Sequence, residues 1–149
     1  MTFKKQIFQE FLRQIDDNIA AYQYTLNELK ESVANETKST AGDKHETALS
    51  MLQIEQSAVA KHLLDAIENK NNFLKISQEV YIDEVRKGSL VKTTQGYFLI
   101  SVALPKIFVN NQWIIAISPT SPLGMQLMGK KLHDECWLMN KFHQIESIS

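Results

Sequence analysis

Two acidic side chains, Asp43 and Glu46, lie three residues apart in the segment TAGDKHETAL, residues 40–49. A pair of carboxylates on exposed backbone can supply oxygen ligands to Mg²⁺, which takes one or two protein carboxylates and fills its other positions with water or phosphate. Because two carboxylates cannot close such a site, a second macromolecule would have to supply the remaining ligands. This chemistry predicts a magnesium site that is shared with a partner.

Helix capping explains the same residues without a metal. Gly42 suits the left-handed position that ends a helix, and Asp43 suits the N-cap of the next helix. Glu46, three residues later, completes an arrangement similar to a capping box. Both acids would also lie favourably at the positive end of the helix dipole. The residues alone favour this structural explanation over the metal site.

The acids lie between two stretches with helical periodicity. In the first stretch, apolar residues recur at steps of three and four, at Phe3, Ile7, Phe11, Ile15, Ile19, Tyr22, Leu26, Leu29 and Val33. After the bend, a second stripe runs through Ala48, Leu52, Val59, Leu63 and Ile67. Two long helices with one apolar stripe each, joined by a short connection, should pack antiparallel. We therefore predict a coiled-coil hairpin over residues 1–77, with its tip at 39–46.

Beyond residue 77 the pattern changes to short runs that are typical of strands. We predict strands at 80–82, 89–91, 97–104, 106–109, 113–117, 136–139 and 142–148. Ser121 and Pro122 are typical of an N-cap and a first helical residue, and Gly129 is typical of a helix end. These elements predict a small α+β domain over residues 78–149.

Composition limits the class of protein. The formal net charge of −1 gives no overall attraction to nucleic acid, which usually requires a basic stripe. The longest purely apolar run, residues 113–117, is too short to span a bilayer, and no signal-peptide core follows the first residues. Cys136 is the only cysteine, which excludes a disulfide framework and a cysteine metal cluster. We expect a cytoplasmic protein without a membrane partner.

Three segments resemble the Gre transcript-cleavage factors of bacteria, GreA and GreB. Residues 42–48, GDKHETA, are similar to the G-D-x-x-E-x-A hairpin tip of that family. Residues 88–91, GSLV, resemble its G-S-x-V strand. Residues 117–135 resemble its I-S-x-x-S-P-L-A/G segment and the L-L-G-K-x-x-G-D that follows. The resemblance covers nearly the whole chain in the same order, and it implies an FKBP-like fold for residues 78–149.

The resemblance also implies a function. The hairpin would enter the secondary channel of RNA polymerase, while the C-terminal domain holds the rim of that channel. Asp43 and Glu46 would help to hold the second Mg²⁺ of the polymerase and to orient the water that hydrolyses backtracked RNA. The expected partners are RNA polymerase and, through it, the 3′ end of the backtracked RNA. The chain would be a monomer with no complete active site and no cofactor of its own.

Polymerase contacts are expected in the matched C-terminal segment, at Ser121, Pro122, Leu123, Gly124 and Lys130. A solvated turn explains Lys130 and its neighbour Lys131 equally well.

Two other functions remain open. Lys44 and His45 occupy positions where the family has an aliphatic residue and then a small or polar one. This departure is compatible with a regulator that occupies the channel without promoting cleavage. A stand-alone prolyl isomerase, suggested by an FKBP-like fold, is disfavoured because the second half offers few aromatic residues to line a pocket. Dependence of RNA cleavage on Asp43 and Glu46 separates the first function from the second.

Overall fold

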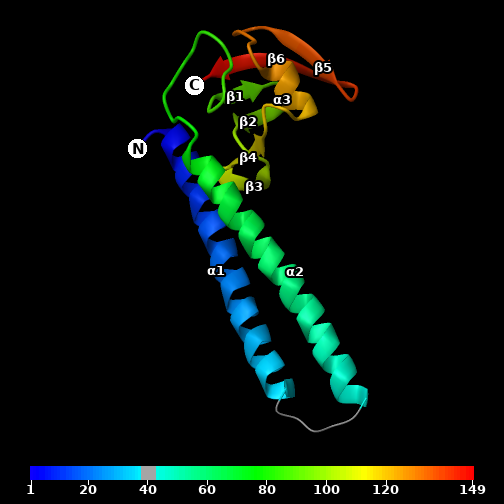
Figure 1. The fold of residues 1–149 in the computed structure, drawn as a ribbon. Coiled ribbons are helices and arrows are strands. Elements are labelled where there is room, and N and C mark those ends of the chain that lie inside the picture. The colour runs from blue at the N-terminus through cyan, green and yellow to red at the C-terminus, as the bar shows by residue number, and fades with distance from the viewer. Residues whose placement is uncertain (38–42) are drawn as a thin grey trace. The chain divides into compact units, whose positions relative to one another are not determined.

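The computed structural model describes residues 1–37 and 43–149, with the side chains of 43–45 left out, as two long helices followed by a six-stranded sheet (Figure 1). The elements are α1 (Phe3–Thr37), α2 (Asp43–Leu74), β1 (Leu90–Thr93), β2 (Gly96–Ile100), β3 (Leu104–Val109), β4 (Gln112–Ile117), α3 (Pro122–Leu127), β5 (Glu135–Leu138) and β6 (Lys141–Ile148). The predicted α+β class is confirmed. Contacts divide the chain into two compact units, residues 14–70 and residues 1–13 with 71–149.

The unit of residues 14–70, here called the hairpin unit, is an antiparallel pair of helices. Lys70 near the end of α2 forms an ion pair of 2.7 Å with Asp16 near the start of α1. Further along, the rings of Tyr22 and His62 stack with centroids 5.8 Å apart. These pairings confirm that the two predicted helices run in opposite directions. Among the described residues, no helix is long and apolar enough to cross a membrane.

The apolar stripes form the seam of the hairpin unit, with one correction. Ile15 and Leu29 of α1 are buried, and Leu52 and Leu63 of α2 are half-buried, as their spacing predicts. Ile67, which we expected in the second stripe, is 36% exposed. Residues 66 and 70, three and seven positions after Leu63, are half-buried instead. A step of three and a step of four both fit the helical period, so the spacing alone did not distinguish residue 66 from Ile67.

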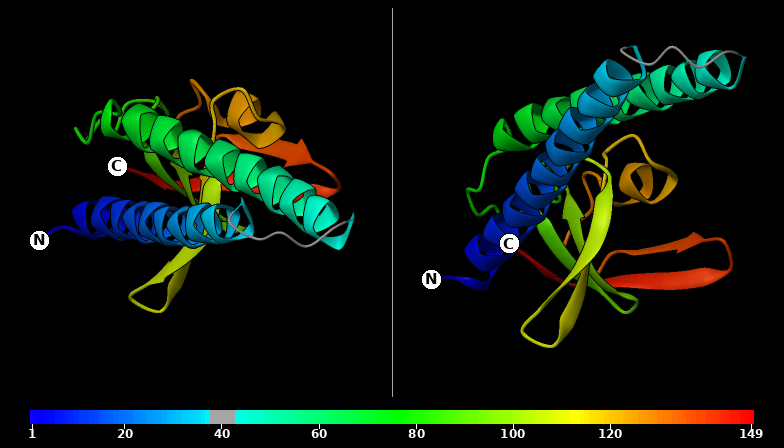
Figure 2. Two further views of the ribbon diagram at one scale, coloured as in Figure 1. Left: turned by 60° about the horizontal axis from the view of Figure 1, so that its bottom comes forward. Right: turned by 90° about the horizontal axis from the view of Figure 1, so that it is seen from below.

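The other unit, here called the sheet unit, is built on one sheet with strand order β3-β4-β2-β1-β6-β5. All neighbouring strands are antiparallel except β2 and β4, which are parallel. On one face, α3 lies beside β5 (Figure 2) and closes a core of Val85, Val91, Phe98, Ile100, Leu127, Cys136, Ile145 and Ile148. Strand residues alternate between faces, so Tyr97 and Leu99 point to the opposite face.

That opposite face carries the first turns of α1 and the end of α2. The ring of Phe3 meets Tyr97 of β2 edge to face at 5.4 Å. Phe73 of α2 lies 5.3 Å from Phe8 and 6.0 Å from Phe11, measured between ring centroids. All three members of this aromatic cluster, Phe8, Phe11 and Phe73, are buried. The two ends of the helices are thus part of the core of the sheet unit.

Most of the predicted strands are confirmed, but the strand at 80–82 is wrong. Residues 78–82 have no regular structure, and Val80 and Ile82 are 60% and 73% exposed. An apolar run forms a stable strand when it finds a neighbouring strand and a face to bury. Here the buried anchors are Ile76 and Val85, on either side of the run, so the apolar residues between them stay in solvent.

A histidine is buried inside the sheet unit. His143 of β6 is 4% exposed, and its Nδ1 lies 3.0 Å from the hydroxyl of Thr93 on the neighbouring strand β1. The ring of Phe98 meets it edge to face at 5.7 Å. Burial, and to a smaller extent the charge of Lys141, lowers the pKa of His143. The fold therefore holds this imidazole in its neutral form.

We predict that His143 makes the fold sensitive to mild acid. As pH falls through the ordinary histidine pKa of 6.5, the unfolded chain takes up a proton before the folded chain does, so the free energy of unfolding decreases. His143→Gln should lose less of its unfolding free energy than the wild type between about pH 7.5 and about pH 5.5, in urea titrations. His62→Gln, at an exposed histidine, is the control for the same substitution outside the sheet unit. Equal pH dependence in the wild type and His143→Gln would contradict this role.

Candidate functional site

The two predicted tip acids lie at the start of α2. Asp43 is its first residue, and Glu46 lies three residues later in the same helix and is exposed. Residues three apart are neighbours on one side of a helix, so the backbone places both acids on a common face. Gly42, most of the predicted tip and the side chain of Asp43 fall outside the described residues, and so does the predicted capping of α2.

Charge is divided unevenly between the two units. The hairpin unit has 5 Lys and Arg against 10 Asp and Glu, whereas the sheet unit has 11 against 7. The overall charge of −1 is thus the sum of −5 on the hairpin unit and +4 on the sheet unit. A surface with this much excess acid repels nucleic-acid phosphates and attracts cations. The hairpin unit therefore suits a positively charged or metal-bearing partner site.

The described part of the chain contains no group of three or more His, Cys, Asp and Glu side chains that could hold a metal by itself.

In the sheet unit, Ser121 fixes the turn that starts α3. Its hydroxyl donates a hydrogen bond to the carbonyl of Ser118 at 2.7 Å and accepts one from the N–H of Gly124 at 3.1 Å. Pro122 occupies the first turn, where its missing N–H leaves no partner unsatisfied. The predicted N-cap is confirmed, and the residues that suggested a partner contact also have a local structural role.

Gly124 and Leu123 are likewise needed by the fold. A Cβ atom on Gly124 would lie 1.9 Å from the carbonyl oxygen of Ser118, so no other residue fits without moving the backbone. Leu123 packs against the core of the sheet unit. Pro122 is exposed, and Lys130 is half-buried, with its carbonyl accepting the N–H of Val85 at 2.8 Å. Of the five expected contact residues, Pro122 offers the most surface to a partner.

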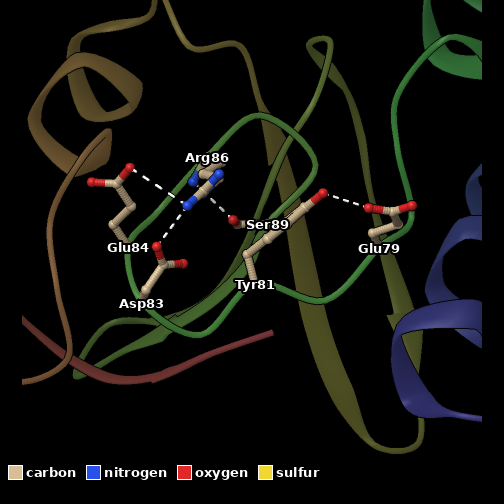
Figure 3. A network of polar contacts seen from close by, with 6 residues as sticks. All are labelled: Glu79, Tyr81, Asp83, Glu84, Arg86 and Ser89. Atoms are coloured by element: carbon tan, nitrogen blue, oxygen red, sulfur yellow. Dashed lines mark hydrogen bonds and ion pairs between the residues drawn. The ribbon is translucent and has the colours of Figure 1, made fainter.

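The segment that connects α2 to β1 in the sequence carries a polar network that the sequence patterns did not indicate (Figure 3). The Arg86 guanidinium donates to the Asp83 carboxylate at 2.6 Å, lies 3.8 Å from a carboxylate oxygen of Glu84, and stands 4.5 Å from the centre of the Tyr81 ring. The Tyr81 hydroxyl donates to Glu79. The three-residue spacing of Asp83 and Arg86 was a usable signal, but nothing local indicated the ring beneath the guanidinium.

This network holds a connecting segment in place and shows no reactive group. The hydrogen bond to Glu79 raises the pKa of Tyr81, and the hydrogen bond from Arg86 lowers the pKa of Asp83. Both groups therefore stay in their ordinary charge states near neutral pH. Nearby, the buried ammonium of Lys4 donates to the carbonyl of Glu79 at 2.8 Å, and burial lowers the pKa of Lys4.

A second missed feature is an open cleft of about 610 Å³ in the sheet unit, here called the basic cleft. It is lined by Asn72, Lys75, Lys87, Ser101, Val102, Ser118, Pro119, Thr120 and Met128. It adjoins the turn that Ser121 fixes, and it draws residues from segments far apart in the sequence. Sequence patterns do not reveal such a site, because its members share no spacing.

No protein-family model matches the chain, and no curated protein matches it in sequence.

We predict that Gly124→Ala destabilises the fold by roughly 3 kcal/mol or more, because the added methyl group collides with a backbone oxygen. The free energy of unfolding in urea measures this. Met125→Ala, at the next and exposed position of α3, is the matched control and should change stability by less than about 0.5 kcal/mol. Similar losses in both variants would show that the close approach at residue 124 is unimportant.

Proposed function

We propose that the protein is a Gre-like transcription elongation factor that binds RNA polymerase through its secondary channel and stimulates cleavage of backtracked RNA. The observation that carries the proposal is a pair of long antiparallel helices with two acids, Asp43 and Glu46, in the first turn of the second helix. As part of the same proposal, the sheet unit has an FKBP-like fold.

The length of the helix pair supports this function. At 1.5 Å per residue, the part of α2 from Asp43 to Lys70 is roughly 40 Å long. An arm of that length can carry two carboxylates into a narrow channel while its other end stays outside. The excess of acidic residues in the hairpin unit favours a destination that offers positive charge.

In the proposed mechanism the chain contributes ligands and orientation, not a complete active site. The carboxylates of Asp43 and Glu46 would complete the oxygen shell around a Mg²⁺ that the polymerase holds, and would accept hydrogen bonds from the attacking water. The metal, when bound, activates that water and stabilises charge on the phosphate. Because Asp43 and Glu46 share one helix, the fold fixes their relative positions before they reach the metal.

The sheet unit would bind the rim of the channel through the surface around α3. Ser121, Leu123 and Gly124 would act indirectly there, since they shape the turn that presents exposed Pro122. Lys130, which lies just beyond α3, would add a positive charge at the same surface. This division of roles explains how one segment can serve both folding and recognition.

A channel-occupying regulator without cleavage activity is the second candidate. The same acidic helix pair would suffice to fill the channel. Lys44 directly follows Asp43 in the sequence, and a positive charge near the two acids would weaken their hold on a metal. This candidate requires the helix pair but not the carboxylates of Asp43 and Glu46.

We predict that the wild type accelerates RNA cleavage in a stalled, backtracked elongation complex, and that Asp43→Asn and Glu46→Gln each lose most of this effect. Each change removes one ionised oxygen ligand while keeping the size of the side chain, and loss of one metal-activating group typically costs about a hundredfold or more in rate. Labelled RNA resolved on a gel gives the rate.

Glu55→Gln is the matched control, because Glu55 is an exposed acid of α2 three helical turns beyond the tip. It should cleave like the wild type. If the wild type leaves cleavage unchanged but competes with a known cleavage factor for polymerase, the regulator is the correct function. If the protein neither stimulates nor competes, both candidates fail.

A further inference from the structure

The basic cleft is bordered by segments that hydrogen bonds and close packing hold in place. At the end of α2, the N–H of Lys75 donates to the carbonyl of Asn72 at 3.3 Å, and the flanking residues Phe73 and Ile76 are buried. Elsewhere in the lining, the hydroxyls of Ser118 and Thr120 lie 3.2 Å apart. The cleft is thus a feature of the folded sheet unit and not of a loose surface loop.

Gly88 brings the second lysine of the cleft close to the first. Its φ of +95° lies in the left-handed region, and a Cβ there would be 2.3 Å from the carbonyl oxygen of Ser77. The chain at Gly88 is therefore pressed against the residues that follow α2. The N–H of Gly88 donates to the carbonyl of Ile100 at 2.6 Å, which fixes this approach. Lys87 and Lys75, separated by eleven positions in the sequence, consequently line one cavity.

The basic cleft carries positive charge from two lysines that have no carboxylate partner among the described residues. Its nine residues include two lysines and no Asp or Glu. Within the part of the chain that the structure describes, neither lysine forms an ion pair, whereas Lys70 and Lys92 each have a carboxylate within 4 Å. The sheet unit as a whole carries an excess of four positive charges, which would attract an anionic partner from a distance.

The kind of anion follows from the other lining residues. Sites for phosphate generally use arginine forks or the N–H groups of glycine-rich loops, and single-stranded nucleic acid is usually bound on aromatic rings. The lining has no arginine, glycine or aromatic residue. It offers hydroxyls, an amide and three apolar side chains, Val102, Pro119 and Met128. This mixture suits the carboxylates, amides and apolar stems of a peptide.

We propose that the basic cleft binds an acidic peptide segment of a partner protein, with Lys75 and Lys87 pairing its carboxylates. Ser118, Thr120 and Asn72 would hydrogen-bond the peptide, and the apolar residues would cover its side-chain stems. This inference does not depend on the identity of the partner. It therefore holds whether or not the protein acts on RNA polymerase.

The test is binding of a short fluorescent peptide of alternating glutamate and leucine, followed by fluorescence anisotropy of the full chain at about 0.1 M salt. The paired substitution Lys75→Glu with Lys87→Glu should weaken binding at least about tenfold, which corresponds to ~1.4 kcal/mol. The milder pair Lys75→Gln with Lys87→Gln should weaken it in the same direction. Unchanged circular dichroism and melting temperature would show that both variants fold.

Two controls separate the cleft from general charge attraction. Lys5→Glu with Lys141→Glu changes the net charge equally at exposed residues outside the cleft, and it should bind within about twofold of the wild type. A peptide with glutamine in place of glutamate should bind the wild type at least about tenfold more weakly. Equal losses in the two lysine pairs, or equal binding of the two peptides, would overturn the proposal.

Two other results would assign the cleft to a different occupant. Tighter binding of an RNA oligonucleotide, lost in the Lys75 and Lys87 variants, would make nucleic acid the ligand. Self-association of the wild type in sedimentation, lost in the same variants, would make a second copy the occupant, through its acidic hairpin unit. The binding assay contains no polymerase, so its outcome is independent of the cleavage assay.

Discussion

The structure depends on the aromatic cluster of Phe8, Phe11 and Phe73. These rings join the first turns of α1 to the last turn of α2 on one face of the sheet unit, with centroids 5.3 and 6.0 Å apart. Replacing a buried phenylalanine by alanine typically costs about 3–5 kcal/mol, a large share of the stability of a domain. The contact between the two helices of the hairpin unit is less extensive, since about one stripe residue per helical turn is covered. The aromatic cluster therefore holds the two helices together more firmly than their own contact does.

Local sequence patterns predicted what local forces determine. The period of three and four found both long helices, because burial of one stripe is their main source of stability. Ser121 and Pro122 predicted the start of α3, because an N-cap residue stabilises only the helical turn that follows it. The same reasoning failed at residues 80–82, whose apolar run has strand character but no strand to pair with. It also failed at Ile67, because residue 66, which fits the helical period equally well, lies in the seam instead.

In the candidate site, too, the residues with local sequence signals could be predicted, and those brought together by the fold could not. Asp43 and Glu46 could be singled out because their spacing and their place at a bend are visible in the chain. Their proposed chemistry comes from a resemblance and not from spacing, which fits a helix cap equally well. Gly124 was read as part of a recognition segment, although its contact with the Ser118 carbonyl shows a structural demand for glycine. The basic cleft could not be predicted, because five separate segments create it.

The discontinuous make-up of the sheet unit has a consequence for biosynthesis. Strand β6 lies between β1 and β5, so the strand that is translated after all the others of this sheet occupies an interior position. All residues of the hairpin unit leave the ribosome before β1 does, and can pair while the chain is still growing. The rings of Phe8 and Phe11 are translated before Phe73 and before the strands, so they cannot be buried until those segments follow. A nascent chain therefore keeps these apolar residues exposed over a long interval, during which it is open to chaperones or aggregation.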